Sequence, residues 1–260
     1  MKNNLTKSLH QAFSLDNETA LITGGGSGLG FAMAQCLVSC GARVVLIGRN
    51  ENRLKQSVKK IGKNAVYRVH DITDFEKSEE LVESVKKSHK NISILINNAG
   101  IHLKKPTIET EVDDFQKVIN THILASHVLV KLVLPDMLKK ARGSILFTAS
   151  MASYIGLPKI VAYSAVKSAF VGMVRSLASE VSSNGIRVNA IAPGWIETPM
   201  LNEALSGDDD RKKKIIERTP MKKFGEPMDI GWTAAFLCSP AAKFITGAVI
   251  PVDGGAHIGF

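Results

Sequence analysis

Residues 19–41 read TALITGGGSGLGFAMAQCLVSCG and contain the two patterns on which the fold prediction rests. The first five, 19–23, are apolar or β-branched, which is typical of a buried strand. Residues 24–30 are rich in glycine, and residues 29–40 have the composition and length of a helix that ends at Gly41. A glycine-rich turn between a strand and a helix is typical of a site for the phosphates of a dinucleotide.

The alternation of strand and helix continues along the chain. The predicted strands cover residues 19–23, 43–47, 65–69, 92–96, 144–148, 186–191 and 249–252, and the predicted helices cover residues 29–40, 51–61, 75–87, 112–139, 162–182 and 229–237. Pro135 is expected to kink or break the longest helix. This alternation favours parallel strands joined by right-handed crossovers. We therefore predict an α/β fold, a doubly wound Rossmann-type parallel sheet of about seven strands with helices on both faces, in a single domain spanning residues 1–260.

Composition limits the functional classes. The 260 residues are 45% apolar, which is ordinary for a globular protein with a core. No stretch approaches the ~20 apolar residues of a membrane span. Residues 1–16 are interpreted as a polar lead-in without the apolar core of a signal peptide. We predict a cytoplasmic protein without a membrane partner. Cys36, Cys40 and Cys238 form no CxxC pair and are interpreted as buried apolar side chains, with no metal site predicted.

The formal net charge is +9, but the lysines are scattered in short groups and aromatic residues make up only 6% of the chain. A nucleic-acid-binding protein concentrates its positive charge on one face, with aromatic residues between the charges. We therefore predict no nucleic-acid partner. A DNA-binding regulator remains a third functional class, which salt-sensitive DNA binding would test.

Polar or turn-forming residues follow six of the predicted strands. They are Gly24, Arg49, Asp71, the pair Asn97 and Asn98, Ser150, and the pair Pro193 and Gly194. These residue types are also common in ordinary turns. However, ligands of open parallel sheets bind outside the carboxyl ends of the strands, so six such placements in series favour a site at this edge.

Tyr163 and Lys167 are four residues apart on a predicted helix and therefore share one face. A free phenol titrates near pH ~10, and a neighbouring ammonium group favours the phenolate and lowers that pKa. The pair predicts proton transfer beside a bound nicotinamide. Tyr154 lacks such a partner, because residue 158 is proline.

Several motifs together resemble one family. They are Thr23-Gly24-x-x-x-Gly28-x-Gly30, Asn97-Asn98-Ala99-Gly100, Ser150, Tyr163-x-x-x-Lys167 and Pro193-Gly194. In this order and at this spacing they resemble the short-chain dehydrogenase/reductases, over about residues 19–255. The resemblance implies hydride transfer between a nicotinamide cofactor and a carbon that carries oxygen.

The resemblance also implies catalytic roles. Tyr163 is expected to be the acid/base, and Lys167 to lower its pKa and hold the nicotinamide ribose. Ser150 is expected to bond the substrate oxygen, and it fits the family spacing better than Ser153. Asn120 is expected to hold a water in the proton relay.

The same resemblance implies contacts with the cofactor. They involve Gly24, Ser27, Gly28, Leu29, Gly30, Arg49, Asp71, Ile72, Asn97, Ala99, Gly100, Tyr163, Lys167, Pro193, Gly194, Ile196 and Thr198. Gly48 stands where an acid would bond the ribose of NAD, and Arg49 follows it, which favours NADP(H). NAD(H) remains the alternative, because Ser27 stands where NADP-dependent members often carry a basic residue.

Three stretches, residues 98–106, 149–151 and 218–225, resemble gluconate 5-dehydrogenase-like members, so we expect a sugar acid or polyol as the small-molecule substrate. A 3-oxoacyl-[acyl-carrier protein] reductase is the alternative enzyme. A non-catalytic cofactor sensor is the alternative of another class, although such proteins usually lose the tyrosine or the lysine. The family also implies a substrate lid at residues 196–216 and a homotetramer packed through the helices of Asn120 and Tyr163. His122 and His127, on the Asn120 helix, are interpreted as structural.

Overall fold

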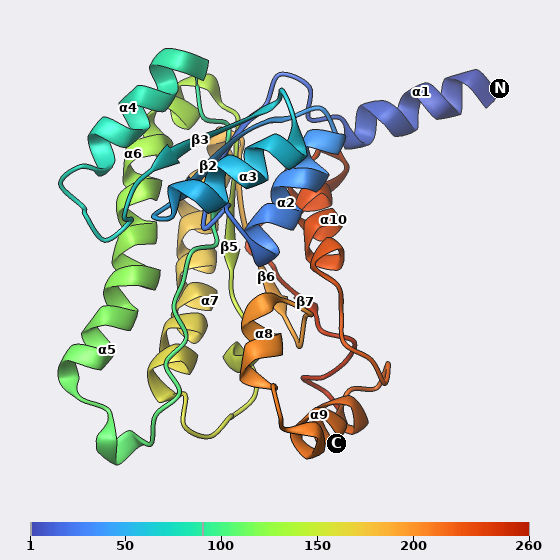
Figure 1. The fold of residues 1–260 in the computed structure, drawn as a ribbon. Helices are drawn as coiled ribbons and strands as arrows, with labels where there is room; N and C mark the ends of the chain where they lie inside the picture. Colours follow the sequence, from blue (N-terminus) through green and yellow to red (C-terminus); the bar gives the residue numbers. More distant parts are fainter. Residues whose placement is uncertain (1, 90, 260) are drawn as a thin grey trace.

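The structure, a computed structural model, describes residues 2–89 and 91–259. Its described part is built on one seven-stranded sheet in the order β3-β2-β1-β4-β5-β6-β7, with every neighbouring pair parallel (Figure 1). The strands are β1 (Thr19–Thr23), β2 (Arg43–Gly48), β3 (Ala65–Val69), β4 (Ile94–Asn97), β5 (Gly143–Thr148), β6 (Ile186–Pro193) and β7 (Val249–Val252). The predicted doubly wound fold is confirmed. The strand order reverses between β1 and β4, and such a switch point is where this class of sheet binds its ligands.

Helices cover both faces of the sheet (Figure 1). One face carries α2 (Gly28–Ser39), α3 (Glu51–Ile61) and α10 (Pro227–Cys238), and the other carries α4 (Ser78–His89), α6 (Ala125–Lys140) and α7 (Val161–Val181). Because successive side chains of a strand point to opposite faces, β1 contributes to both cores. Leu21 packs in the core under α6 and α7, whereas Ala20 and Ile22 pack in the core under α2 and α10. Burial on both faces explains why the parallel strands are continuously apolar.

The long predicted helix differs from expectation. It consists of α5 (Val112–Ile119), a π-helical turn η2 (Asn120–Leu124) and α6, and the helix continues through Pro135. Of the predicted kink or break at Pro135, the break does not occur. Val133 and Met137 on either side of the proline are buried against the sheet, and this packing keeps the segment helical.

This run, residues 112–140, is long and apolar enough to cross a membrane by length and composition alone. The sequence-based expectation counted only uninterrupted apolar residues and did not identify it. In its most apolar window 39% of the residues are buried, and its buried side chains, such as Leu129, belong to the core. The core helix of a globular protein passes the same test.

The N-terminal segment expected to be a polar lead-in forms a helix, α1 (Lys2–Phe13), which extends away from the body of the molecule (Figure 1). The Phe13 ring lies 6.2 Å from that of Phe236 on α10, so an apolar contact fixes its last turn. The region expected to be a lid contains two short helices, α8 (Pro199–Ala204) and α9 (Asp209–Arg218), with Leu205 and Ile215 buried.

Candidate active site

The ends of β1 and β4 are tied together through one hydroxyl group. Thr23 Oγ1 accepts hydrogen bonds from the backbone N–H groups of Asn98 (2.9 Å) and Ala99 (3.0 Å), and donates to the Ile96 carbonyl (3.3 Å). The Asn98 side chain donates back to the Thr23 carbonyl at 3.0 Å. This network fixes the point where the chain turns from β1 into the glycine-rich segment.

Glycine is required where neighbouring atoms approach the backbone of this turn too closely for a Cβ atom. A Cβ atom at Gly30 would overlap the Gly24 carbonyl oxygen and lie 2.7 Å from Asn98 Nδ2. Gly24 has φ +66°, a value that favours glycine. At Gly28, also at positive φ, an added Cβ would meet only the Thr198 side chain, at 3.8 Å. The turn is therefore packed against Asn98 on one side and faces open space at Gly28.

This open side fits a dinucleotide's pyrophosphate. Ser27 is the N-cap of α2, and its side chain makes no capping hydrogen bond. The first N–H groups of a helix lack helical partners and carry partial positive charge, so those of Gly28, Leu29 and Gly30 suit an anion. The glycine-rich turn is the predicted place for the phosphates, and Thr198, predicted as a separate cofactor contact, lies across the gap.

Arg49 and Asp71 lie at the ends of β2 and β3, and the structure brings them together. Arg49 Nη1 is 3.8 Å from Asp71 Oδ2, and the two side chains are 73% and 44% exposed. Burial acts to raise the pKa of the Asp71 carboxyl group, but hydrogen bonds from Thr73 and the charge of Arg49 outweigh it and lower that pKa. An exposed ion pair contributes little to stability, so Arg49 can exchange this partner for a phosphate.

Asn97, also predicted to contact the cofactor, ends β4 with a buried side chain. Its Nδ2 and Oδ1 atoms have no hydrogen-bond partner within the described residues. A buried amide without partners is costly. Both atoms are therefore available to a ligand or an ordered water. Ile72 packs against the core below α6 and α7.

Three of the four predicted catalytic residues, Ser150, Tyr163 and Lys167, lie at the end of β5 and on the first turns of α7. Ser150 follows β5, and its side chain hydrogen-bonds that of Tyr163 and accepts the Ala152 N–H at 3.1 Å. Lys167 lies one turn after Tyr163 on α7, with Nζ 5.4 Å from the centre of the phenol ring. The side chains of Ser153 and Tyr154, the alternatives to Ser150 and Tyr163, form other hydrogen bonds. Ser153 Oγ donates to the Lys167 carbonyl, and Tyr154 Oη donates to the Val249 carbonyl.

The electrostatics of this pair differ from the expectation. Burial raises the pKa of Tyr163, although the hydrogen bond with Ser150 opposes the rise. Burial also lowers the pKa of Lys167 to about 7. Lys167 Nζ donates to the Thr148 carbonyl at 2.5 Å, so the ammonium group is hydrogen-bonded to the end of β5. The expected lowering of the Tyr163 pKa by Lys167 is therefore wrong, because burial is the largest influence on the pKa of each group.

A continuous hydrogen-bonded path connects the glycine-rich turn to the catalytic lysine. It runs from Thr23 to Asn98, then to Thr148, whose hydroxyl donates to Asn98 Oδ1 at 3.3 Å, and then to Lys167. The path crosses from β1 through β4 to β5, the strands that flank the switch point. It fixes the relative positions of the two halves of the site.

Two histidines lie against the Tyr163 ring. The His102 ring is 4.8 Å from it, tilted by 51°, and the His122 ring meets it edge-on at 5.9 Å. His122 is buried, accepts the Ile101 N–H at 3.1 Å, and has a pKa lowered to about 3, chiefly by burial. An added Cβ at Gly100 would lie 2.9 Å from His122 Nε2, so this glycine makes room for the ring. His122 thus holds the loop after β4, in agreement with its structural interpretation, and His127 is exposed.

Asn120 opens the π-helical turn η2, and its Oδ1 accepts a hydrogen bond from Gln116 at 2.7 Å. A π-turn inside an α-helix is often found at a functional site. Asn120 lies two residues before His122, which touches Tyr163, so the turn faces the start of α7.

The remaining residues predicted to contact the cofactor lie at the end of β6 and in the segment after it. An added Cβ at Gly194, after Pro193, would lie 2.6 Å from the Asp253 Cα atom, so glycine is needed where the chain passes β7. Ile196 is buried and bridges to Gly225, and Thr198 caps α8 by accepting the Leu201 N–H at 3.2 Å.

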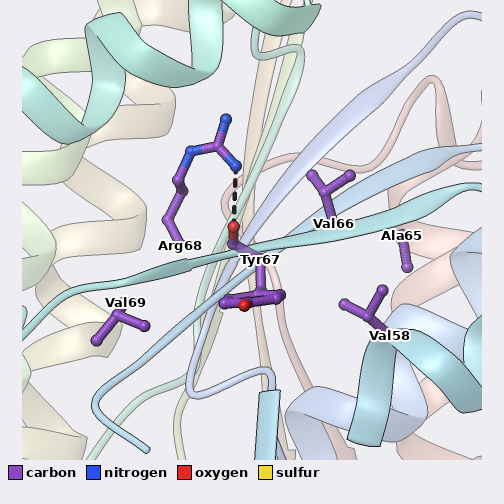
Figure 2. Close-up of a pocket in the computed structure, with 6 residues that line it drawn as sticks. All are labelled: Val58, Ala65, Val66, Tyr67, Arg68 and Val69. Carbon is purple, nitrogen blue, oxygen red and sulfur yellow. Dashed lines mark hydrogen bonds between the residues drawn. The ribbon is translucent and has the colours of Figure 1, made fainter. Parts of the chain in front are cut away.

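A groove of about 440 Å³ lies elsewhere, along the edge strand β3 (Figure 2). Its lining residues are Val58, Ala65, Val66, Tyr67, Arg68 and Val69. Figure 2 shows the Arg68 guanidinium turned back onto the Tyr67 carbonyl, which it bonds at 2.9 Å. None of the predicted site residues lines this groove. Within residues 2–89 and 91–259, no cluster of three or more His, Cys, Asp or Glu residues could hold a metal ion.

The sequence patterns did not identify His102 and Thr148 as residues of the candidate active site. His102 stands two residues after the Asn97–Gly100 motif, but no pattern shows that its ring faces Tyr163. The role of Thr148 depends on its carbonyl and hydroxyl pointing to different partners, which only the fold brings together.

Comparison with known proteins shows what this chain is similar to. The sequence profile of a family described as enoyl-(acyl carrier protein) reductase matches residues 24–257. A tropinone reductase homolog of Arabidopsis thaliana is 36% identical over 254 residues, 96% of this chain and 82% of the relative. The 2-dehydro-3-deoxy-D-gluconate 5-dehydrogenase of Bacillus subtilis is 34% identical over 249 residues, 95% of this chain and 97% of the relative.

Among solved structures, one from Beutenbergia cavernae is described as an NAD(P)-dependent gluconate 5-dehydrogenase with NADP bound at low occupancy. It superposes on this chain with a TM-score of 0.89 and 36% identity, covering 94% of this chain and 98% of its own.

Proposed function

The chain belongs to the short-chain dehydrogenase/reductase family, and on that premise we propose that it interconverts a secondary alcohol and a ketone on a sugar acid or polyol, with NADP(H). Family membership makes it an oxidoreductase acting on CH–OH groups of small molecules, with a nicotinamide cofactor. One observation carries the proposal. The Tyr163 phenol bonds Ser150 and lies beside Lys167, and the Thr23–Asn98–Thr148–Lys167 path connects this pair to a turn shaped for phosphates.

The chain's own residues provide orientation and proton transfer. When bound, the nicotinamide supplies the hydride chemistry. Ser150 Oγ donates a hydrogen bond to the substrate oxygen, and Tyr163 Oη gives a proton to that oxygen during reduction or takes it during oxidation. Lys167, one turn away, binds the nicotinamide ribose and, when charged, favours the phenolate. Asn120 holds a water that returns protons to the pair.

The raised pKa of Tyr163 favours the protonated phenol, which is the acid form. An ordered ligand with hydroxyl groups would give Lys167 additional hydrogen bonds, which favour its charged form. A charged lysine would then lower the Tyr163 pKa. Cofactor binding therefore sets the protonation states that the reaction needs.

The cofactor preference depends on the end of β2. Gly48 provides no carboxylate for a ribose hydroxyl, and the exposed Arg49 is placed to pair with a 2′-phosphate. Asp71, its present partner, would then be free to contact the adenine. NADP(H) is favoured on these grounds, with NAD(H) as the alternative.

The substrate class is supported by the gluconate-type relatives and structural neighbours. The second candidate is a 3-oxoacyl-[acyl-carrier protein] reductase. The matching family profile is described as enoyl-(acyl carrier protein) reductase, so the two share only the class of acyl substrate. Retention of both Tyr163 and Lys167 disfavours a cofactor sensor.

We also propose one domain, a cytoplasmic location and a homotetramer. The tetramer would cover exposed apolar side chains on the helices of Asn120 and Tyr163, among them Val112 (81% exposed) and Val161 (43%).

The test is a substrate panel with purified protein. Gluconate, 2-dehydro-3-deoxygluconate and a short 3-oxoacyl thioester are each offered with NADP(H) and NAD(H), and turnover is followed by the absorbance of the reduced nicotinamide. We expect the highest kcat/KM with a sugar acid and NADP(H). Preferred reduction of the thioester would select the second candidate, and absence of turnover with all pairs would contradict the proposal.

A further inference from the structure

The ammonium group of Lys167 lies against two aromatic rings of its own helix. Its Nζ atom is 5.4 Å from the centre of the Tyr163 ring and 5.2 Å from the centre of the Phe170 ring. Resting on the proposed function, we propose that Phe170 is a positioning residue of the active site, whose ring face stabilises the charged form of Lys167 beside Tyr163.

The first support is the geometry of α7. Tyr163, Lys167 and Phe170 are spaced four and then three residues apart, so their side chains share one face of the helix. A cation within about 6 Å of a ring centre is attracted by the negative charge density of the ring face. Lys167 meets this condition with both rings. The attraction is stronger in a buried site, because water screens it less.

The second support is that the Phe170 ring is held in place. Phe170 is 1% exposed, and its ring centre lies 5.2 Å from that of Phe147 on β5 and 6.3 Å from that of His122 on η2. These contacts come from two different elements, a strand of the sheet and the π-helical turn. The ring therefore presents its face to the ammonium group from a fixed position.

The third support is that the lysine charge needs stabilisation. Lys167 is 4% exposed, and burial lowers its pKa to about 7. Its Nζ atom donates to the Thr148 carbonyl, and the rings add a second kind of contact. A ring face attracts the ammonium group but not the neutral amine. Phe170 therefore opposes the effect of burial and increases the charged fraction of Lys167 at neutral pH.

Two titratable groups face Lys167, and both are neutral near pH 7. Burial raises the pKa of Tyr163 on the same helix. The pKa of His122 on η2 is lowered to about 3, mainly by burial and also by the charge of Lys167. Neither group supplies a negative charge to the ammonium group, which increases the importance of the ring faces.

The experiment replaces Phe170 with mono-, di- and trifluorophenylalanine. Fluorine withdraws electron density from the ring face and nearly preserves the shape of the side chain, so the attraction weakens in steps while the packing is kept. For the trifluoro variant we expect the Lys167 pKa to fall by about one pH unit, which is a tenfold loss in the stabilisation of the charged form.

The first measurement is denaturant unfolding of the protein alone, from about pH 5 to about pH 10. The unfolded chain binds more protons than the folded protein between the folded and unfolded pKa values of Lys167, so its contribution to stability rises with pH in that range. A weaker ring face lowers the folded pKa. The rise should therefore begin about one pH unit lower in the trifluoro variant, with smaller shifts for fewer fluorine atoms.

The second measurement is the oxidation of gluconate with NADP. A charged lysine favours the phenolate that takes the proton of the alcohol, so kcat should fall at high pH where Lys167 loses its charge. The alkaline limb of the kcat profile should move to lower pH in the same steps as the stability profile. A purely structural role of Phe170 would not produce this order.

The matched control introduces the same fluorinated residues at Phe147. Phe147 is fully buried and packs against Phe170, so fluorination there changes the same core. In the described part of the chain, the rings placed over Lys167 Nζ are those of Tyr163 and Phe170. We therefore expect the Phe147 variants to shift the stability profile by less than about 0.3 pH unit. Equal shifts at the two positions, or no shift at position 170, would overturn the inference.

The outcomes separate this inference from the proposed function. Stepwise shifts of the stability profile at position 170, without turnover of any alcohol in the panel, would support the role of Phe170 and reject the proposed reaction. Turnover of a sugar acid with unchanged stability profiles would leave the dehydrogenase standing and reject the role of Phe170.

Discussion

The end of β1 and the end of β5 lie at the same edge of the sheet but are built in opposite ways. At the end of β1, the side chains of Thr23 and Asn98 each hydrogen-bond the other residue's backbone, and Thr23 also accepts the Ala99 N–H. At β5, Lys167 is buried with a strongly lowered pKa and the Tyr163 pKa is raised, and among the described residues His122 Nδ1 has no hydrogen-bond partner. The first region is a rigid support. The second holds groups whose pKa values burial has shifted, as is common where a protein binds and reacts.

The largest effect is expected from removing the proton donor of the β5 region. Tyr163→Phe should lower kcat about 10³-fold or more, since general acid–base catalysis contributes roughly 10²–10⁴-fold. The NADPH Kd should change less than about threefold, because the phosphates are held at the glycine-rich turn. Steady-state kinetics and a fluorescence titration with NADPH measure the two quantities. Turnover near the wild-type rate would remove Tyr163 from the mechanism.

The next largest effect is expected from breaking the β1 support. Thr23→Val removes the acceptor for the Asn98 and Ala99 N–H groups, so the free energy of unfolding should fall by roughly 2–4 kcal/mol. Denaturant unfolding measures it. The matched control is Thr233→Val on α10, whose hydroxyl donates to the Asp229 carbonyl of its own helix, and there we expect a change below about 0.5 kcal/mol. Equal losses in the two variants would show that the network is unimportant.

Lys167→Met should raise the free energy of unfolding by about 1 kcal/mol at neutral pH. The same change should abolish turnover. In the wild type the lysine pKa falls from 10.5 unfolded to about 7 folded, so the unfolded state binds more protons between these values. This residue's contribution to stability therefore rises from about pH 7 to about pH 10. The variant should lack that rise. Thermal melting across this pH range tests the difference, and identical pH profiles for the two proteins would contradict the assignment.

The smallest effect concerns the adenosine end of the β1 region. Arg49→Gln should lower the ratio of kcat/KM for NADPH to that for NADH about tenfold, the effect of losing ~1.4 kcal/mol of phosphate pairing. The melting temperature should hardly change, because the pair with Asp71 is exposed. An unchanged cofactor ratio would mean that another residue selects the cofactor.

Local patterns predicted most of this molecule well. All seven strands were placed within two residues of their observed ends, since short buried β-branched runs between turn residues have few alternatives. Tyr163, Lys167 and Ser150 lie together in the structure because two of them share a helix face and the third follows a neighbouring strand. By contrast, α1 and the π-turn at Asn120 were missed, because contacts distant in sequence stabilise the former and no simple periodicity marks the latter.

The sequence by itself determined the alternation of strands and helices, the glycines of the turn, and which polar residues end which strands, because these depend on short-range sterics and on burial. Only the tertiary structure decided the protonation states and partners of those residues. Burial raised the pKa of the phenol and lowered that of the lysine, the Thr148 carbonyl received the ammonium group, and His102 came to face Tyr163. Desolvation and hydrogen bonding depend on what surrounds a group in space, and neighbours along the chain do not specify that.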